Sequence, residues 1–497
     1  MVIADNSKVM KNFRKTVSTV LMSLFMAACN IQDNPQENQS NPQSIQFTGW
    51  TEDPATRTTL VNGIETAWVS GTDRIGIFSL QARVSEEGEP PAHNVPFLAL
   101  ESAKTSGFSG TLLWGAPAAE HVFHAYYPYQ VLDEPTPDAV PVSLTAEQVQ
   151  AGANDSRHIS ALDFMVSTPV ALYSPESPGE ASANVGLTFN HVFTLMEYRI
   201  TGSGQGLTDI SLVGAGALSF SSGTIDLDQE PGADPYTITK SGTSTYVLAH
   251  VSSGVILSDT PVSVYKMVLP GAQTADMSIK VKTGGTWKTM TKAPPTGGFQ
   301  RGKKYVTQLN ADDAAFIPDT YVYIPDENLR AYCLTNFDSN SDGKITFAEA
   351  ENGAMTTINV SGKNIMSLEG IQFFTHVNNL MASGNLLTYL DVSNNQELQL
   401  INCNYNKLTT LKAGGFTNLK TLYCSNNQLS DLDVTENGLL ETLVCKNNLL
   451  TCLDVSNNAR LDYLDCRDNP YLDTIYVAKD QTIADLYKDE HTTIVTR

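Results

Sequence analysis

The chain has little cysteine, tryptophan and positive charge. The uneven placement of the first two indicates separate domains, and the lack of positive charge limits the kinds of partner. Its 497 residues hold no cysteine between Cys29 and Cys333, and all four tryptophans precede Cys333. This shift in composition predicts two or three domains, because so long a chain exceeds a single hydrophobic core. The 31 lysines and arginines are outnumbered by 53 aspartates and glutamates, for a formal charge of −22. A surface with so little positive charge argues against nucleic acid as a partner.

The sequence also lacks the motifs of common enzymes. It contains no H-E-x-x-H, no G-x-S-x-G, no P-loop and no G-x-G-x-x-G. His191 lies in an apolar run, where a hydrogen-bonded core histidine is the expectation and a catalytic one the alternative. We therefore expect no enzyme. A glycan-processing enzyme stays open, because a pair of acidic residues needs no fixed spacing in the sequence.

The first 28 residues have the features of an export signal. A basic start precedes an apolar run at residues 17–28, which is too short to span a bilayer. The run ends in Met26-Ala-Ala-Cys29, which resembles a bacterial lipobox. This resemblance implies that Cys29 is acylated and anchors the protein at the outer membrane or cell surface, whereas a plain secretory signal is the alternative. Residues 29–44 are rich in Asn, Gln and Pro, and we expect a flexible tether.

The region from residue 45 to about 310 is expected to form strands. Short alternating runs such as Ile75-Gly-Ile-Phe are separated by Gly, Pro, Ser and Asp, and no long helical period is present. This pattern predicts two tandem β-sandwiches. A loop signal at Ser174-Pro-Glu-Ser-Pro-Gly divides them into residues 45–180 and 181–310.

Several motifs of this region, in their order, resemble the fimbrillin-like proteins of the Bacteroides group. They are Thr56-Arg-Thr-Thr, Gly71-Thr-Asp-Arg-Ile-Gly-Ile-Phe, Leu187-Thr-Phe-Asn-His191, Met267-Val-Leu-Pro and Gly298-Phe-Gln-Arg-Gly-Lys-Lys-Tyr305. The resemblance implies an exported lipoprotein with two tandem sandwiches. Some members of that family polymerise into fimbriae after cleavage near an arginine, and whether Arg57 is such a site stays open. A further domain after the second sandwich disfavours a polymerising subunit and leaves an accessory or tip subunit open.

A 21-residue repeat between residues 390 and 469 is the strongest pattern in the chain. The unit reads L-x-x-L-x-C-x-x-N-x-L-x-x-L-D-V-S-x-N. Its ladders are Leu398, Leu419, Leu440, Leu461; Ile401, Leu422, Leu443, Leu464; Cys403, Cys424, Cys445, Cys466; and Asn406, Asn427, Asn448, Asn469. A fixed period of this length predicts stacked coils around one core, and the pattern resembles a leucine-rich repeat. We expect repeats over residues 356–476 and a C-terminal cap over 477–497, with a short helix near Thr482 to Tyr487.

The ladder side chains are expected to be structural. A buried asparagine can satisfy backbone groups of its own coil and of the next one. In-register cysteines on strands ~4.8 Å apart fit a disulfide poorly, since a disulfide needs converging side chains. A zinc site would need close pairs such as C-x-x-C, which are absent. Buried apolar thiols are therefore the favoured interpretation.

Residues 338–349 match the EF-hand calcium loop at every position of D-x-[DN]-x-[DN]-G-x5-E. Calcium takes six to eight oxygen ligands. The expected ligands are Asp338, Asn340, Asp342, the Lys344 carbonyl, Thr346 directly or through a water, and Glu349. Residues 311–355 resemble the helical N-terminal cap of leucine-rich surface proteins, so we expect a structural calcium ion there. An Asx-rich turn that caps a helix is the alternative.

The exposed face of the repeat strands is the predicted binding surface. Its outward positions carry an aromatic and charged patch, made of Tyr423, Lys446, Tyr463, Asp465 and Arg467. Tyrosine and arginine are common anchors of binding surfaces, although an ordinary solvated face is the alternative. The fold expected for the whole chain is tandem all-β sandwiches followed by an α/β leucine-rich repeat solenoid with an EF-hand-like cap. The expected function is adhesion or recognition of a protein or glycan, and a fimbrial subunit that contacts other fimbrial subunits is the alternative.

Overall fold

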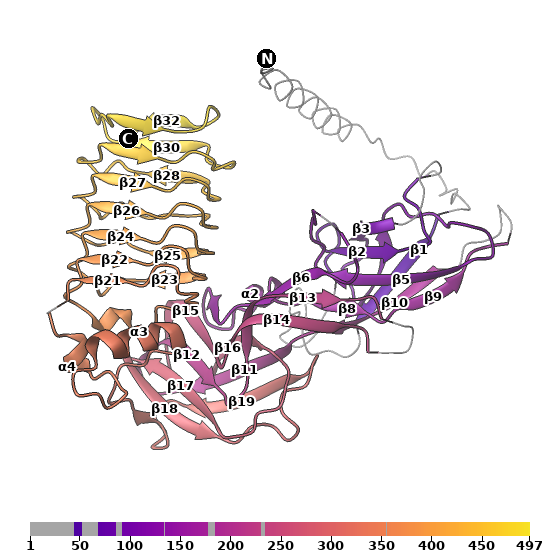
Figure 1. The fold of residues 1–497 in the computed structure, drawn as a ribbon, viewed down its shortest axis with the longest axis horizontal. Coiled ribbons are helices and arrows are strands. Elements are labelled where there is room, and N and C mark those ends of the chain that lie inside the picture. Colours follow the sequence, from indigo (N-terminus) through magenta and orange to yellow (C-terminus); the bar gives the residue numbers. More distant parts are fainter. Residues whose placement is uncertain are drawn as a thin grey trace, which may run out of the picture.

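The computed structural model describes residues 44–51, 68–85, 92–133, 135–176, 184–229, 234–353 and 355–497. Cys29 and Arg57, and with them the lipid anchor and the processing site, lie outside the described residues. Within the described ranges, no helix is both long and apolar enough to cross a membrane. The chain is mostly β structure, and Figure 1 shows two β regions followed by a stack of short strands.

The first β region is one sheet that closes on itself. Its strand order is β2 (Arg74–Ser79), β3 (Ala92–Ala99), β4 (Thr105–Ser109), β1 (Gln46–Thr51), β10 (Asn184–His191), β8 (Met165–Ser167), β5 (Glu120–Tyr127) and β9 (Val170–Tyr173). A further pairing of β2 with β5 joins the two sides. Inside, Phe47 packs edge-to-face on Phe97 and Phe123, with ring centroids 4.9 and 5.4 Å apart. β1 lies between β4 and β10 and runs parallel to β10.

The strand pairings cross the expected division at residue 180. β10 follows that point in the sequence, yet it pairs in the first sheet. β6 (Val140–Leu144) and β7 (Glu147–Gln150) precede it, yet they pair with β13 (Ser219–Asp226) and β15 (Tyr246–Ile256). A shared cluster that includes Phe78, Tyr126, Leu195 and Met267 explains why the regions interlock, since it buries apolar side chains from both.

The second β region, here called the second sandwich, is built from three sheets. They are β16 (Val262–Val268), β11 (Thr194–Thr201) and β19 (Lys304–Asn310); β20 (Ile317–Pro318), β18 (Thr286–Lys292), β17 (Met277–Thr283), β12 (Gly206–Val213), β15 and β7; and β14 (Thr237–Ser244), β13 and β6. Tyr198, Ile210, Val264 and Ile279 share one buried cluster between the first two sheets. This layered packing is the sandwich that the alternating pattern predicted.

A short helical segment connects the second sandwich to the strand stack. α3 (Glu327–Phe337) begins at Asp326, whose carboxylate accepts hydrogen bonds from the backbone N–H groups of Asn328 and Leu329. The helix buries Leu329, Cys333 and Phe337 in the same apolar cluster as the coils that follow. α4 (Phe347–Ala350) comes after residues 338–346. One further short helix, α2 (Arg157–Ser160), lies against β7 and β16 of the second sandwich.

The stack that follows, here called the array, has strands on two sides (Figure 1). The front sheet is parallel and contains β21 (Thr357–Asn359), β22 (Asn379–Met381), β24 (Leu400–Asn402), β26 (Thr421–Tyr423), β27 (Thr442–Val444), β29 (Tyr463–Asp465) and β31 (Asp485–Tyr487). The back strands are β23 (Tyr389–Asp391) with β25 (Thr410–Lys412), and β28 (Cys452–Asp454), β30 (Thr474–Val477) and β32 (Thr493–Thr496). A single-turn 3-10 helix, η1 (Ile371–Phe373), lies in an early coil. The short helix expected near Tyr487 is wrong, because Leu486 pairs in register with Leu464 and extends the front sheet.

Side-chain amides and thiols occupy the interior as expected. The Asn448 amide donates to the carbonyls of Cys424 and Cys445, and its oxygen accepts the Leu429 N–H, all at 3.0 Å. Asn427 repeats the pattern one coil earlier. The ladder cysteines are free and fully buried. Burial raises the pKa of the Cys403 thiol to about 12, which keeps it protonated and apolar.

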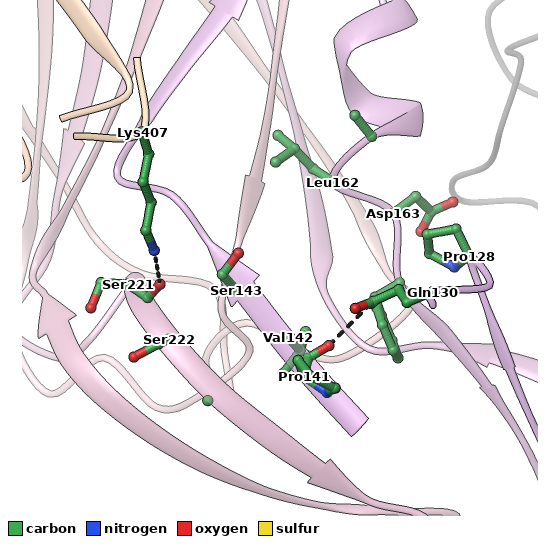
Figure 2. Close-up of a pocket in the computed structure, with 13 residues that line it drawn as sticks. Pro128, Gln130, Pro141, Val142, Ser143, Leu162, Asp163, Ser221, Ser222 and Lys407 are labelled. Atoms are coloured by element: carbon green, nitrogen blue, oxygen red, sulfur yellow. Dashed lines mark hydrogen bonds between the residues drawn. The ribbon is translucent and has the colours of Figure 1, made fainter. Parts of the chain in front are cut away.

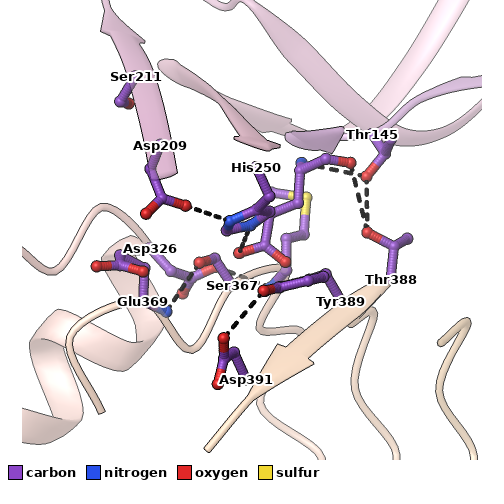
Figure 3. A network of polar contacts seen from close by, with 12 residues as sticks. Thr145, Asp209, Ser211, His250, Asp326, Ser367, Glu369, Thr388, Tyr389 and Asp391 are labelled. Carbon is purple, nitrogen blue, oxygen red and sulfur yellow. Dashed lines mark hydrogen bonds and ion pairs between the residues drawn. The ribbon is translucent and has the colours of Figure 1, made fainter. Parts of the chain in front are cut away.

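A buried polar network fixes the array to the second sandwich (Figure 3). His250 Nδ1 lies 2.6 Å from Asp209 Oδ1, and Nε2 lies 3.7 Å from Glu147 Oε1. The imidazole stacks on Tyr389 of the array, with ring centroids 3.8 Å apart. Burial opposes a charge on His250, but the contacts to Asp209 and Glu147 together outweigh it and raise the His250 pKa to about 9. The imidazolium therefore pairs with Asp209 and lies beside Glu147, whose own pKa is raised by burial, next to the first coils.

Other contacts cross the same junction. Lys282 Nζ lies 3.2 Å from the Glu369 carboxylate, which also accepts the indole N–H of Trp287 at 2.9 Å. On another side, Lys407 Nζ donates to the Ser221 carbonyl at 3.2 Å, beside a cavity of about 300 Å³ (Figure 2). Because the buried His250 network and these surface contacts lie at different places on the junction, we expect the array to be held in one orientation on the second sandwich.

Candidate functional site

The front sheet presents two columns of outward side chains. β-strand side chains alternate, so the central residue of each strand points into the core and its neighbours point outward. Leu422, Leu443 and Leu464 are fully buried, as this alternation requires. The register places Thr442 beside Tyr463 and, in the second column, Tyr423 beside Val444 and then Asp465. The predicted face therefore exists as one surface.

An aromatic and charged cluster occupies the C-terminal end of this surface. The rings of Tyr463 and Tyr487 lie 5.6 Å apart, and the guanidinium of Arg467 lies 5.0 Å from the Tyr487 centroid. Arg467 is held by two hydrogen bonds to Asp465, at 2.9 and 2.6 Å. These bonds lower the pKa of Asp465, which is only 5% exposed. Asp465 thus positions Arg467 and offers little surface of its own to a ligand.

The other two residues of the predicted patch lie apart from this cluster. Tyr423 is half-buried on β26, two strands before β29. Lys446 forms an ion pair with Asp468, with 3.2 Å between Nζ and the carboxylate. The structure therefore brings Tyr463, Asp465 and Arg467 together. Tyr423 and Lys446 lie on the two preceding coils.

Tyr487 is the member of this face that the sequence interpretation missed. It is 40% exposed and pairs with Asp465, which lies 22 residues earlier rather than 21. A search of the sequence for a repeat unit with one inserted residue would have placed Tyr487 on this face. Here the cluster of Tyr463, Asp465, Arg467 and Tyr487 is called the array patch.

The calcium-like loop has a pre-organised backbone. The Asp338 carboxylate accepts the N–H groups of Asp342 and Gly343, and the Asn340 side-chain oxygen also accepts the Asp342 N–H. Asp342 in turn accepts the Lys344 N–H at 2.9 Å. Gly343 has φ +79°, a conformation that suits glycine at the sharp turn of such a loop. The donor set is oxygen only, which is the chemistry that calcium takes.

Glu349, the last predicted ligand, is engaged elsewhere. Its carboxylate accepts the N–H and hydroxyl of Thr346 and the N–H and hydroxyl of Ser339, at 2.8 to 2.9 Å. These hydrogen bonds lower the Glu349 pKa to about 2, so the group is ionised near neutral pH. Within the described ranges, no three His, Cys, Asp or Glu residues are grouped to hold a metal. Glu349 would have to exchange these bonds to complete a calcium shell.

The comparisons with known proteins agree with the two halves of the fold. Residues 56–320 match the fimbrillin-like family, and residues 396–436 match two copies of leucine-rich repeats. A candidate fimbrium subunit, Fim1C of Bacteroides uniformis, is 23% identical over 254 residues, which cover 50% of this chain and 75% of that protein.

Two solved structures are similar to parts of this chain. A candidate cell adhesion protein of Bacteroides uniformis is 17% identical with a TM-score of 0.37, covering 57% of this chain and 97% of that one. The functional domain of InlJ from Listeria monocytogenes, which includes a cysteine ladder, is 31% identical with a TM-score of 0.27 and covers 31% and 36%. Since the family match spans more than half of the 497 residues, this protein belongs to the fimbrillin-like family.

Proposed function

We propose that this protein is a non-enzymatic adhesion or recognition protein of the cell surface, which binds a protein or glycan through the array patch. The observation that carries the proposal is the cluster of half-buried Tyr463 and Arg467 with exposed Tyr487, in which Asp465 fixes Arg467. Tyrosine and arginine are enriched where binding energy concentrates, and an arginine held in place loses less entropy on binding. The fimbrium and adhesion proteins similar to this chain support a surface role.

The chain supplies a matched control for this proposal. On the back strands, Arg497 lies 3.6 Å from the Tyr476 centroid and pairs with Asp454, so the same three residue types meet there. In a panel of surface glycoproteins and glycans, we expect Arg467→Ala to weaken the wild-type interaction by about 2 kcal/mol, or roughly thirtyfold. Arg497→Ala should leave it unchanged. Equal losses in both variants, or none in Arg467→Ala, would refute binding by the array patch.

We further propose that α3 and the loop at residues 338–349 form the cap of a leucine-rich repeat solenoid and that the loop holds a structural calcium ion. The shared core of α3 and the coils supports the cap, and the oxygen-only donor set supports calcium. At calcium concentrations near 100 times Kd, binding should stabilise the array by about 2.7 kcal/mol. That corresponds to a rise in Tm of roughly 5–10 °C in calorimetry.

Asp338→Ala should abolish this rise, and Glu349→Gln should weaken it while keeping the capping hydrogen bonds to Thr346, because glutamine also serves in a capping box. Glu351→Gln, at an exposed carboxylate outside the loop, is the control. If the wild type shows no heat of binding and no change in Tm with calcium, the calcium proposal is wrong and the loop is only a capping turn.

For localisation, we propose a lipid on Cys29 that tethers the protein at the outer membrane or cell surface. The support is the residue pattern before Cys29. Metabolic labelling with a palmitate analogue should mark the wild type and not Cys29→Ser, and labelling of neither would contradict the anchor.

A fimbrial accessory or tip subunit is the second candidate function. One observation favours it: β1 lies inside the closed sheet, with Ile45 and Phe47 almost fully buried, and precedes Arg57 in the sequence. Cleavage at Arg57 would free β1 from the rest of the chain and leave a strand-shaped space between β4 and β10. Co-purification with fimbrial subunits from the same cells would support this function.

A further inference from the structure

A groove of about 590 Å³ lies between the second sandwich and the loop that precedes α4. β17 and β18 form one wall and the loop and α3 form the other. Its lining includes Lys280, Thr291, Tyr321, Tyr323, Arg330 and Lys344. Ligand sites favour such junctions between domains, and this volume lies in their usual range. The groove is separate from the array patch.

The positive charge of this groove is unusual for the chain. Lys280 is neutralised by Asp319, at 2.6 Å. Arg330 donates only to main-chain carbonyls, those of Ile324 and Pro325, and the described residues show no ion pair for Arg330 or for Lys344. Two uncompensated cations therefore line one cavity in a protein of net charge −22. Such a site favours an anionic ligand by charge complementarity.

Tyrosine rings give the groove an apolar surface. Tyr323 is fixed by a 2.8 Å hydrogen bond between its hydroxyl and that of Ser211, and by an edge-to-face contact with Trp287 at 5.1 Å. Lys344 Nζ lies 4.3 Å from the centroid of the Tyr321 ring, and Lys280 Nζ lies 4.5 Å from that of Tyr323, so each ring carries an ammonium group on one face. No hydrogen bond engages the Tyr321 hydroxyl among the described residues, which leaves it available to a ligand.

The two walls are already joined, so the groove exists without a ligand. The Val322 N–H donates to the Ile345 carbonyl at 2.8 Å, and Tyr321 forms a β-bridge with Thr346. Lys280 and Asp319 connect the wall formed by β17 to the chain that leads into the loop. A preformed site loses less free energy to ordering when a ligand binds.

We propose that this groove binds an acidic saccharide. The hydroxyl groups of Tyr321 and Thr291 pair with sugar hydroxyls, and Arg330 with Lys344 receives a carboxylate or sulfate. This site is independent of the function proposed for the array patch. It would give the protein a second point of contact with a charged glycan.

Calorimetry on the full chain with three probes of equal length tests the proposal. The probes are an oligogalacturonate, which carries carboxylates, a heparin-derived oligosaccharide, which carries sulfates, and a neutral maltooligosaccharide. We expect one or both acidic probes to bind, with affinity that falls as salt rises from about 0.05 to 0.5 M. The neutral probe should bind at least about tenfold more weakly. Equal binding of the neutral probe, or no binding of either acidic probe, would overturn the proposal.

Variants then locate the binding. Lys344→Gln and Arg330→Gln should each weaken the acidic probe about tenfold, and Lys344→Gln retains the main-chain carbonyl of the loop. Thr291→Trp, which fills the groove without changing its charge, should abolish binding. Lys363→Gln is the matched control, because Lys363 also lies over a tyrosine, 5.9 Å from the Tyr332 centroid, but outside the groove. Binding that Thr291→Trp leaves intact, or that Lys363→Gln weakens as much as Lys344→Gln, would place the saccharide elsewhere.

Discussion

His250→Ala is expected to lower the free energy of unfolding by about 3 kcal/mol, because it leaves Glu147 buried without a cation and leaves Asp209 with only Lys282, 3.5 Å away. It also removes the ring that stacks on Tyr389 of the array. For a unit of this size the loss corresponds to a fall in Tm of roughly 10 °C. Hydrogen exchange should rise first in β15 and β23, which flank the junction. A variant that melts like the wild type would show that the network does not hold the array.

The same network makes stability depend on pH. The folded pKa of His250 is raised from 6.5 to about 9, so its stabilisation is complete below pH 6.5 and is lost as pH rises through 9. The difference corresponds to about 3 kcal/mol. Tm should therefore fall between pH 6.5 and 9 in the wild type and much less in His250→Gln. His376→Gln is the control, because His376 pairs with Glu397 at the exposed surface of the array.

Asn448→Ala is expected to destabilise the array by about 3 kcal/mol. The substitution removes the four hydrogen bonds of the Asn448 amide and leaves the Leu429 N–H without a partner. The Cys424 and Cys445 carbonyls each keep one amide donor, from Asn427 and Asn469. Since each coil contacts only its neighbours, the weakened interface should separate the coils before it from those after it. Hydrogen exchange over β26, β27 and β29 measures this directly. Tryptophan fluorescence does not, because no tryptophan lies in the array.

Asn418→Ala is the matched control for the ladder. Asn418 is exposed and makes one hydrogen bond, to the Gln396 carbonyl at 3.1 Å. Its loss should change stability by less than about 0.5 kcal/mol. Similar effects of the two substitutions would mean that the buried amides do not join the coils.

Local periodicity explains what the sequence predicted well. The Asn and Cys ladders repeat at one step, and each position requires the same buried environment, so Asn448 and Cys445 could be assigned before the structure. The alternating runs likewise predicted strands, and the ordered motifs predicted the fimbrillin-like family. In each case the signal lies within a few dozen neighbouring residues.

Long-range pairing explains what the sequence did not predict. β1 and β10 are partners although about 140 residues separate them, and nothing in either strand specifies the other. Tyr487 was missed because one inserted residue breaks the period. The junction of His250, Glu147 and Tyr389 comes from three distant segments, and each residue alone looks like an ordinary polar side chain.

Hydrogen exchange with a bound ligand shows whether the array binds while the fimbrillin-like region only carries it. With a ligand recovered from the binding panel, we expect protection of β27, β29 and β31 around Tyr463 and Tyr487, with β28, β30 and β32 unchanged. Protection of β1, β4 and β10 with an unchanged array would contradict it and favour fimbrial assembly through the first sheet.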